Sequence, residues 1–365
     1  MPYIPIYIEK YYIYDILHND NNQLIIILPS EMEPIKIKYK NASFILKNCP
    51  DNHTYIYVLK NTPYKEYIEL NINGNIVKTK VNKYPEFKNK IIISTIVYNE
   101  DNYIRQWIKF YLNIGIDKFI IYDNSDSNDN KSYKSVETTS NLTNVLSDYI
   151  KEEKVILIKW SYPYRLSISG ISGQTTQQNH SIYAFQTCKY IGLFDVDEYI
   201  NMQKHINIKR FLAKQIRKQS INVNKIGGFK ILCKLFYNIN NLPETDYNFF
   251  KIQHCSKIFK HGREKHFVIP KNVNTYSVHN ITSGKSSYTL NSSLIYFNHY
   301  YFLNKPTRGR NINDQSIRDV NERNIIRSNN NITHLKNLEG EITQLNKNGL
   351  YLDKTILKHI KNIKN

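Results

Sequence analysis

The sequence predicts an α/β fold: a doubly wound parallel sheet, preceded by a small all-β module and followed by a helical, polar extension. From Ile91 onward, apolar strand-like runs alternate with helix-like stretches. Before Ile91, short β-branched and aromatic runs are separated by polar turns. The 365 residues exceed what a single core usually supports. We therefore predict a β-rich module over residues 1–89, an α/β domain over residues 90–312 and a helical extension over residues 313–365.

The β-rich module is predicted from three strand-like runs and one hairpin signal. The runs are residues 41–47, 54–60 and 66–72. Asn73-Gly74 lies between two apolar runs, which is the strongest local signal for a two-residue hairpin turn. A segment with Pro and several Lys, residues 84–90, marks the boundary to the next unit. The pattern fits a carbohydrate-binding role and a purely structural one equally well.

The α/β domain begins with residues 91–97, a continuous apolar run typical of a strand buried on both faces. Asn99 to Asp101 can cap the following helix, whose apolar residues recur at helical spacing until Gly115 ends it. The further predicted elements, in order, are strands at 118–122 and 155–158, a helix at 175–188, a strand at 190–194, a basic helix at 204–217, a turn at Gly227-Gly228 and a loop-rich segment at 256–269.

Acidic side chains follow two of the predicted strands, at the sheet edge where such folds bind ligands. Asp195 and Asp197 lie two residues apart, so on an extended segment they point to the same side, about 7 Å apart. Two such carboxylates can gather Mg²⁺ or Mn²⁺, although a solvated strand end gives the same triplet. Asn99 and Glu100 can bind a nucleotide or cap a helix. Asp123 can accept from a ribose hydroxyl or form a turn.

The formal net charge of +19 is unevenly distributed. Residues 1–200 contain 22 basic and 22 acidic side chains, whereas residues 201–365 contain 28 and 9. This excess is typical of proteins that bind nucleic acid or an anionic membrane surface, but a codon bias that enriches Ile, Asn, Lys and Tyr would also raise it. No nucleic-acid-binding motif is recognisable. The apolar run at 24–28 is too short to span a bilayer, so we expect a soluble, cytoplasmic protein without a membrane span.

Five segments, in the same order, resemble landmarks of glycosyltransferase family 92. They are residues 93–125 with Asn99-Glu100, 194–199 (Phe-Asp-Val-Asp-Glu-Tyr), 256–258 (Ser-Lys-Ile), 278–279 (Val-His) and 298–300 (Asn-His-Tyr). The resemblance covers about residues 91–310. It implies a GT-A-type, Rossmann-like nucleotide-sugar-binding fold. It also implies an inverting, Mn²⁺- or Mg²⁺-dependent transfer from a UDP-sugar, often UDP-galactose, to a glycan or glycoprotein acceptor.

The resemblance also implies roles for individual residues. The implied metal ligands are Asp195, Asp197 and a late histidine, with His279 and His299 as the two candidates. The implied donor-binding residues are Asn99, Glu100, Asp123, Asp195 and Lys257, assisted by Arg263 and Lys265 or by Arg308 and Arg310. Inversion needs a general base on the acceptor hydroxyl. Its candidates are Glu244, Asp246 and Glu264, among which the sequence does not choose.

Two other functions are compatible with the sequence. A nucleic-acid-binding protein would use the basic carboxyl-terminal half, and its binding would fall steeply with salt and need no UDP. A catalytically inactive UDP-sugar-binding module would retain UDP without turnover, although the intact Asp195-Val196-Asp197 favours an active enzyme. We place the diphosphate, the late histidines and the acceptor in the basic half. The composition suits a microbial or large-virus source, and the oligomeric state is left open.

Overall fold

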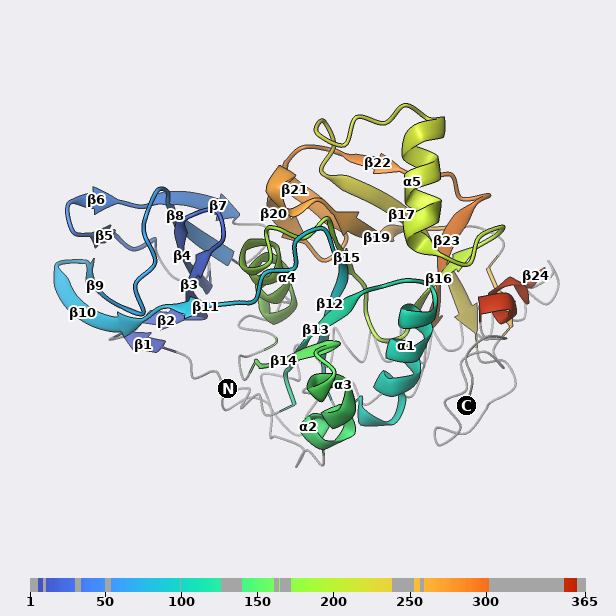
Figure 1. Cartoon of the computed structure of the whole chain (residues 1–365), viewed down its shortest axis with the longest axis horizontal. Helices are drawn as coiled ribbons and strands as arrows, with labels where there is room; N and C mark the ends of the chain where they lie inside the picture. Colours follow the sequence, from blue (N-terminus) through green and yellow to red (C-terminus); the bar gives the residue numbers. More distant parts are fainter. Residues whose placement is uncertain are drawn as a thin grey trace, which may run out of the picture.

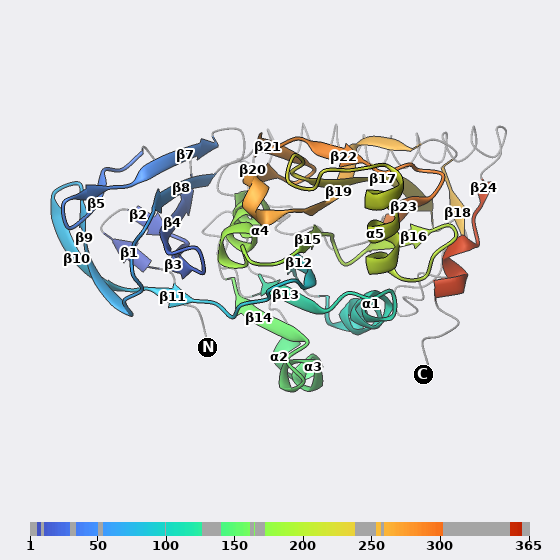
Figure 2. The same cartoon turned by 45° about the horizontal axis from the view of Figure 1, so that its top comes forward.

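The computed structural model describes residues 6–8, 11–29, 34–49, 54–98, 100–125, 140–160, 164, 172–237, 253–256, 259–301 and 351–359. In the described part, β-strands contain more residues than helices do, and few helices lie between the strands (Figure 1). The amino-terminal β strands lie at one side of the molecule and a large curled sheet with its helices at the other, with one helix between them (Figures 1 and 2). The predicted α/β core is therefore part of a mainly β structure.

The amino-terminal part consists of two packed sheets and a small hairpin. The hairpin is β1 (Ile6–Ile8) and β2 (Tyr11–Ile13). One sheet has the order β11 (Asn82–Lys83), β3 (Asp15–Asn19), β4 (Gln23–Pro29), β8 (Thr54–Leu59) and β7 (Ile45–Cys49). The other has the order β10 (Asn75–Lys80), β9 (Tyr67–Ile72), β5 (Ile37–Tyr39) and β6 (Ala42–Ser43). The predicted hairpin joins β9 to β10, with φ of 51° at Asn73 and 99° at Gly74.

The five-stranded sheet is buried on both faces, and alternate residues of its strands enter different cores because they point in opposite directions. In β4, Leu24, Ile26 and Leu28 pack against the four-stranded sheet. Ile25 and Ile27 share a second core with the rest of the chain, across the helix α4 (Ser172–Ala184). The amino-terminal part and the α/β part therefore share a core. The division at residues 89 and 312 stays a prediction.

The α/β part contains four parallel strands in the order β14 (Val155–Lys159), β13 (Lys118–Asp123), β12 (Ile91–Val97) and β15 (Tyr190–Leu193). The helices between them are α1 (Asp101–Asn113), α2 (Leu142–Val145), α3 (Ser147–Lys151) and α4. In β12, Ile91 and Ile93 pack on the side of α1, whereas Ile92 and Ile96 pack on the side of α4. Helices thus cover both faces, as predicted, and the strand order reverses between β12 and β15.

The large sheet continues beyond β15 with antiparallel and mixed pairs. The further elements are β16 (Glu198–Met202), α5 (Ile208–Lys218), β17 (Gly228–Tyr237), β18 (His254–Cys255), β19 (Lys260–Val268), η3 (Pro270–Asn272), β20 (Val273–Ser277), β21 (Asn280–Gly284), β22 (Ser287–Thr289), β23 (Ile295–Tyr301), β24 (Tyr351–Leu352) and η4 (Thr355–His359). Strand β19 pairs antiparallel with both β15 and β17. Strand β23 pairs parallel with β17 and antiparallel with β16. This last pairing positions the site described below.

Two sequence predictions in this region are wrong. The segment predicted as loop-rich contains β19, a strand hidden from the sequence pattern because it buries the polar residues Lys265 and His266. Gly227-Gly228 does not form the predicted turn, since β17 begins at Gly228. A Cβ atom at Gly227 would lie 2.0 Å from the Lys285 carbonyl oxygen, so the backbones approach too closely for a side chain. Of the predicted helical extension, residues 351–359 form β24 and a short 3-10 helix, and the other residues from 313 on lie outside the described part.

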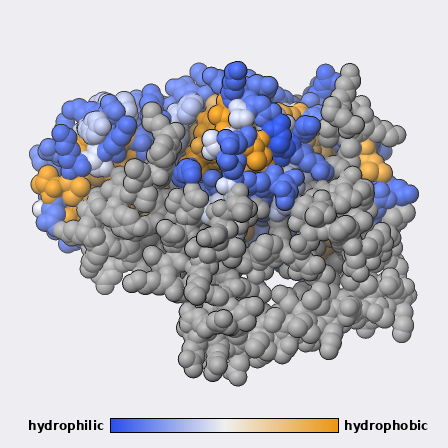
Figure 3. Space-filling view, turned by 90° about the horizontal axis from the view of Figure 1, so that it is seen from below, coloured by the Kyte–Doolittle hydropathy of each residue, from blue (hydrophilic) through white to orange (hydrophobic). Residues whose placement is uncertain are grey.

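Strand β14 forms one edge of the large sheet. A hollow of about 600 Å³ lies along this edge and is lined by Pro85, Phe87, Lys118, Thr143, Ile150, Glu153, Val155, Ile156, Leu157 and Lys159. The molecule seen from below shows an apolar patch rimmed by hydrophilic side chains (Figure 3).

Among the described residues, no helix is both long and apolar enough to cross a bilayer.

Candidate functional site

The acidic segment 195–198 lies between β15 and β16, at the carboxyl end of the parallel strands. The strand order of the sheet reverses between β12 and β15, and the segment follows β15. Open α/β sheets bind ligands at such a reversal. The Glu198 amide donates to the Asp195 carbonyl oxygen over 3.1 Å, so the segment is a turn. The prediction that Asp195 and Asp197 lie on an extended strand and point the same way is therefore wrong.

Two side chains of helix α1 bind the backbone of this turn. The Trp107 indole N–H lies 3.1 Å from the carbonyl oxygens of both Asp195 and Glu198, and the Tyr111 hydroxyl donates to the Glu198 carbonyl over 2.9 Å. Both aromatic side chains are fully buried. In addition, the Asp195 amide donates to Glu198 Oε2 over 2.9 Å. The backbone of the turn is thus held by α1 and by its own Glu198, which fixes where the carboxylates point.

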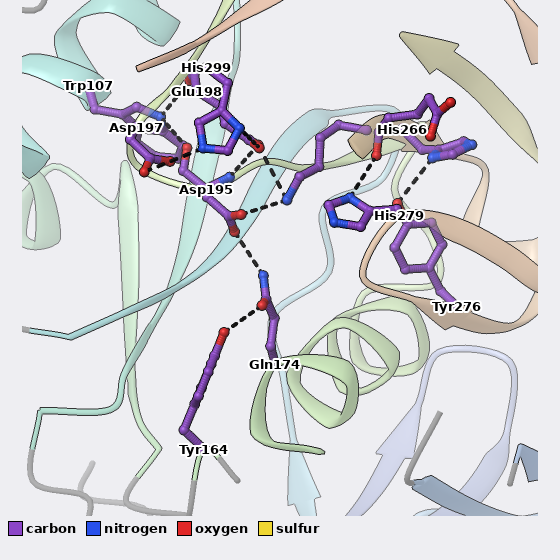
Figure 4. Close-up of polar contacts among 12 residues, drawn as sticks. Trp107, Tyr164, Gln174, Asp195, Asp197, Glu198, His266, Tyr276, His279 and His299 are labelled. Carbon is purple, nitrogen blue, oxygen red and sulfur yellow. Dashed lines mark hydrogen bonds and ion pairs between the residues drawn. The ribbon is translucent and has the colours of Figure 1, made fainter. Parts of the chain in front are cut away.

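Asp197, Glu198 and His299 form a cluster of potential metal ligands (Figure 4). The register of β16 and β23 places Glu198 directly opposite His299. Nε2 of His299 lies 3.7 Å from Asp197 Oδ2, and Nδ1 lies 3.8 Å from Glu198 Oε1. One ligand atom from each residue lies within 4.8 Å of the others. Two carboxylates and an imidazole suit Mn²⁺ or a similar divalent cation, so these residues fit the implied metal.

The first aspartate is held separately from this cluster. Lys265 is fully buried, and its Nζ lies 2.7 Å from Asp195 Oδ2 and 3.3 Å from Glu198 Oε2. The Gln174 amide donates to Asp195 Oδ1 over 2.9 Å, and the Tyr164 hydroxyl donates to Gln174 Oε1 over 2.8 Å. Both carboxylate oxygens of Asp195 therefore bind side chains of the chain itself. The structure does not group Asp195 with the cluster (Figure 4).

Burial and charge pairing shift the pKa values of these groups. Burial raises the pKa of Glu198 to about 7, against the lowering effect of Lys265. Burial alone would lower the pKa of His299, but the Asp197 carboxylate raises it to about 10. Partial loss of contact with water opposes ionisation of Asp195 too, yet the Lys265 charge holds its pKa below the usual value. At neutral pH, His299 thus supplies beside Asp197 the positive charge that a bound cation would supply there.

The second candidate histidine, His279, lies apart from Asp197, Glu198 and His299 (Figure 4). Its Nδ1 is 3.2 Å from the Glu264 carbonyl oxygen. Burial, followed by the nearby Lys265 charge, lowers its pKa to about 4. His299 and not His279 therefore shares the cluster with Asp197. The Glu264 side chain is nearly buried, with Oε1 3.7 Å from His261 Nδ1.

The remaining predicted residues are distributed as follows. Glu100 precedes α1 at the N-cap position, without a side-chain capping bond. Asp123 ends β13, and its Oδ1 accepts a hydrogen bond from the Ser125 amide over 3.0 Å, the local turn bond that the sequence allowed. The predicted residues outside the described part are Asn99, Lys257, Glu244, Asp246, Arg308 and Arg310.

Sequence reasoning missed Glu198 as a candidate metal ligand and Gln174 as a partner of Asp195. It also missed the character of α4, in which residues 174–181 are all polar and none is more than 5% exposed. Their side chains bind several other parts of the chain, including Ser94 on β12, which accepts from Gln177, and Tyr276 on β20, whose carbonyl accepts from Asn179. Eight consecutive uncharged polar residues were a signal, but their pattern is also typical of a surface loop.

Comparison with known proteins gives one family. The model of glycosyltransferase family 92 matches residues 91–341. A family 92 protein of Ricinus communis is 19% identical over 223 residues, which are 60% of this chain and 36% of that protein. Family 92 proteins of Arabidopsis thaliana (24% over 136 residues, 37% of this chain) and Oryza sativa subsp. japonica (22% over 146 residues, 40%) also match.

The chain spans well under half the length of these relatives, with 36%, 20% and 21% of their residues matched. Among solved structures, a maltogenic amylase from S. marinus matches 42% of this chain and 31% of its own. Its 11% identity and TM-score of 0.16 carry no inference about fold or function.

Proposed function

The chain belongs to glycosyltransferase family 92, and from this membership we propose that it transfers a sugar from a UDP-sugar to a hydroxyl of a glycan or glycoprotein acceptor. We propose a GT-A-type site, a divalent cation and inversion at the transferred sugar, with UDP-galactose as the first donor to test. The observation that carries the proposal is the Asp197, Glu198 and His299 cluster at the carboxyl end of the parallel strands.

Each residue of the site has a part in this proposal. Asp197, Glu198 and His299 hold the cation. A bound Mn²⁺ or Mg²⁺ neutralises the charge that develops on the departing diphosphate. Asp195, whose side chain is 35% exposed, faces the donor while Lys265 keeps it ionised and Gln174 fixes its orientation. Trp107 and Tyr111 hold the turn so that these carboxylates need not reorganise when the donor binds.

The general base is proposed to be one of Glu244, Asp246 and Glu264. Glu264 directly precedes Lys265 on β19. Exchange of each acid for its amide separates the three. The base is the residue whose variant still binds UDP but no longer transfers sugar.

The experiment that tests the function measures UDP release from a panel of UDP-sugars with Mn²⁺. We compare the wild type with Asp197→Asn, and with Asp148→Asn as a control, since Asp148 is an exposed residue of α3 that pairs with Arg105. The Asp197 variant should lose about 100-fold or more of the Mn²⁺-dependent rate, and the Asp148 variant should lose none. Equal rates for Asp197→Asn and the wild type would contradict the assigned cation site. UDP binding without release from any donor would indicate an inactive binding module.

A further inference from the structure

The basic helix α5 has one buried face and one cationic face. Ile208, Phe211 and Leu212 are buried in the core, and Asn207 caps the helix by accepting from the Arg210 amide. The opposite face is exposed and carries Lys209, Arg210, Lys214, Arg217 and Lys218. No acidic residue occurs in the sequence from 203 to 230. The helix therefore presents a row of positive charges to solvent.

Two further lysines extend this row. A hollow of about 130 Å³ beside α5 is lined by Lys90 and Lys189 as well as Lys209. We define the cationic face as Lys90, Lys189, Lys209, Arg210, Lys214, Arg217 and Lys218. Among the described residues that line the hollow, Asp117 is the only acid, and it pairs with Lys209. At the start of α5, burial and then the charges of Lys214 and Lys358 lower the pKa of His205, which fits a positive field there.

The cationic face lies at the end of the sheet opposite the candidate site. The hollow is lined by Ile91 and Tyr190, the first residues of β12 and β15, whereas residues 195–198 follow the last residue of β15. A seven-residue strand such as β12 is about 20 Å long. The charges on α5 therefore lie away from the site proposed for the diphosphate, and this helix is a part of the basic half that a single UDP-sugar does not need.

We propose that the cationic face attaches the protein to a membrane surface of anionic phospholipids, with a headgroup phosphate in the hollow between Lys90, Lys189 and Lys209. A row of cations on one helix face complements a plane of negative headgroups. Ile206, which directly precedes the helix region and is 55% exposed, supplies an apolar side chain that can enter the interface. The site at the other end of the sheet then remains open to its substrates.

A nucleic acid fits the same face less well. Proteins that bind single strands stack bases on aromatic side chains, and the exposed residues of α5 include no aromatic one. Duplex binders place a helix in a groove, but phosphate binding gives no role to the exposed Ile206 beside α5, whereas a membrane interface would bury it.

Sedimentation with vesicles tests the proposal on the full chain. Vesicles are made of phosphatidylcholine alone or with about a quarter phosphatidylserine, and each cation near such a surface strengthens binding about fivefold. The variant Arg210→Gln/Lys214→Gln/Arg217→Gln should therefore bind phosphatidylserine vesicles on the order of 100-fold more weakly than the wild type. The control Lys38→Gln/Lys65→Gln/Lys78→Gln removes the same charge from exposed positions of the amino-terminal sheets. It should bind like the wild type.

Binding to phosphatidylserine vesicles but not to phosphatidylcholine, lost only in the α5 variant, would support the proposal. Three results would overturn it: no binding of the wild type to either vesicle, equal weakening in both triple variants, or tighter binding to a DNA or RNA duplex than to the vesicles at the same salt concentration. All six substituted side chains are exposed, so each variant should keep the wild-type melting temperature, which thermal unfolding measures.

Discussion

Replacing Asp15 by alanine tests whether the amino-terminal sheets support the candidate site. Asp15 on β3 is fully buried. Its carboxylate accepts from the Asn82 amide over 2.8 Å and from the Tyr84 hydroxyl over 2.7 Å, and it lies 2.7 Å from Nε2 of His180 on α4. The other nitrogen of His180 lies 2.7 Å from the hydroxyl of Tyr122 on β13. Asp15 therefore links the amino-terminal sheet to α4 and through it to the parallel sheet.

The alanine variant removes the common acceptor of three side chains, of which His180 is buried and Asn82 and Tyr84 are half-buried. An unsatisfied buried group costs about 1–3 kcal/mol, and each half-buried group, which water can reach, loses a net hydrogen bond of about 0.5–1.5 kcal/mol. We therefore expect a loss of about 2–5 kcal/mol in the free energy of unfolding. Asp15→Asn keeps one carbonyl acceptor in place and should lose about 1–3 kcal/mol. Urea unfolding followed by circular dichroism measures both.

The alanine variant should also weaken catalysis at temperatures where it stays folded, because α4 carries Gln174, the partner of Asp195. A loss of stability below about 1 kcal/mol would refute the reasoning. So would two separate unfolding transitions of which only the first responds to the substitution, since they would show that the amino-terminal sheets unfold independently of the site.

Three further predictions follow from single side chains. Trp107→Phe removes the N–H that binds the carbonyls of Asp195 and Glu198, so Mn²⁺-dependent UDP release should fall roughly tenfold, and an unchanged rate would contradict the role of the indole. The melting temperature should also fall by a few degrees, because the smaller ring leaves a cavity in the core. Burial lowers the pKa of His359 to about 4. The neutral form of His359 stabilises the fold above about pH 6.5, and this contribution is lost as the pH falls toward 4, so the hydrogen-exchange protection factors of residues 351–359, which correct for the slower intrinsic exchange in acid, should fall in that window. Burial raises the pKa of three buried thiols, Cys188, Cys233 and Cys255, and that of Cys255 to about 12. Because the thiolate is the reactive form, iodoacetamide at pH 8 should leave these three residues unlabelled in the folded protein, as measured by mass spectrometry.

The sequence predicted those parts of the fold in which burial alone decides the pattern. The strand β12 is apolar throughout because both of its faces are covered, and α1 shows helical spacing because only one side is buried. The apolar pattern did not predict the burial of the helix α4 or the strand β19. Both bury polar side chains that are satisfied by residues far away in the chain, as Asn179 is by Tyr276 and Lys265 by Asp195. Only the tertiary fold supplies these partners.

The same limit applies to the candidate site. Asp197 and His299 were predicted from the family pattern, but Glu198 joins them only because the register of β16 and β23 sets it opposite His299, a residue about one hundred positions away. Asp195 was expected to share a cation with Asp197. The turn at 195–198 separates their side chains, and the buried Lys265, which the sequence offered only as an assisting charge, lies next to Asp195 instead.

The five-stranded sheet of the amino-terminal β-rich module has a structural role. Both of its faces are buried in the described part of the chain, whereas the four-stranded sheet leaves residues such as Tyr67 and Ile76 exposed, so a carbohydrate-binding role of that second sheet stays open. On the side facing α4, Asp15 binds His180, and Thr54 on β8 lies 2.9 Å from Thr176, hydroxyl to hydroxyl. A helix of uncharged polar residues could not stay buried without such partners, because each unpaired polar group would destabilise the fold. The amino-terminal sheets are thus part of what holds α4, and with it Gln174 and Asp195, in place.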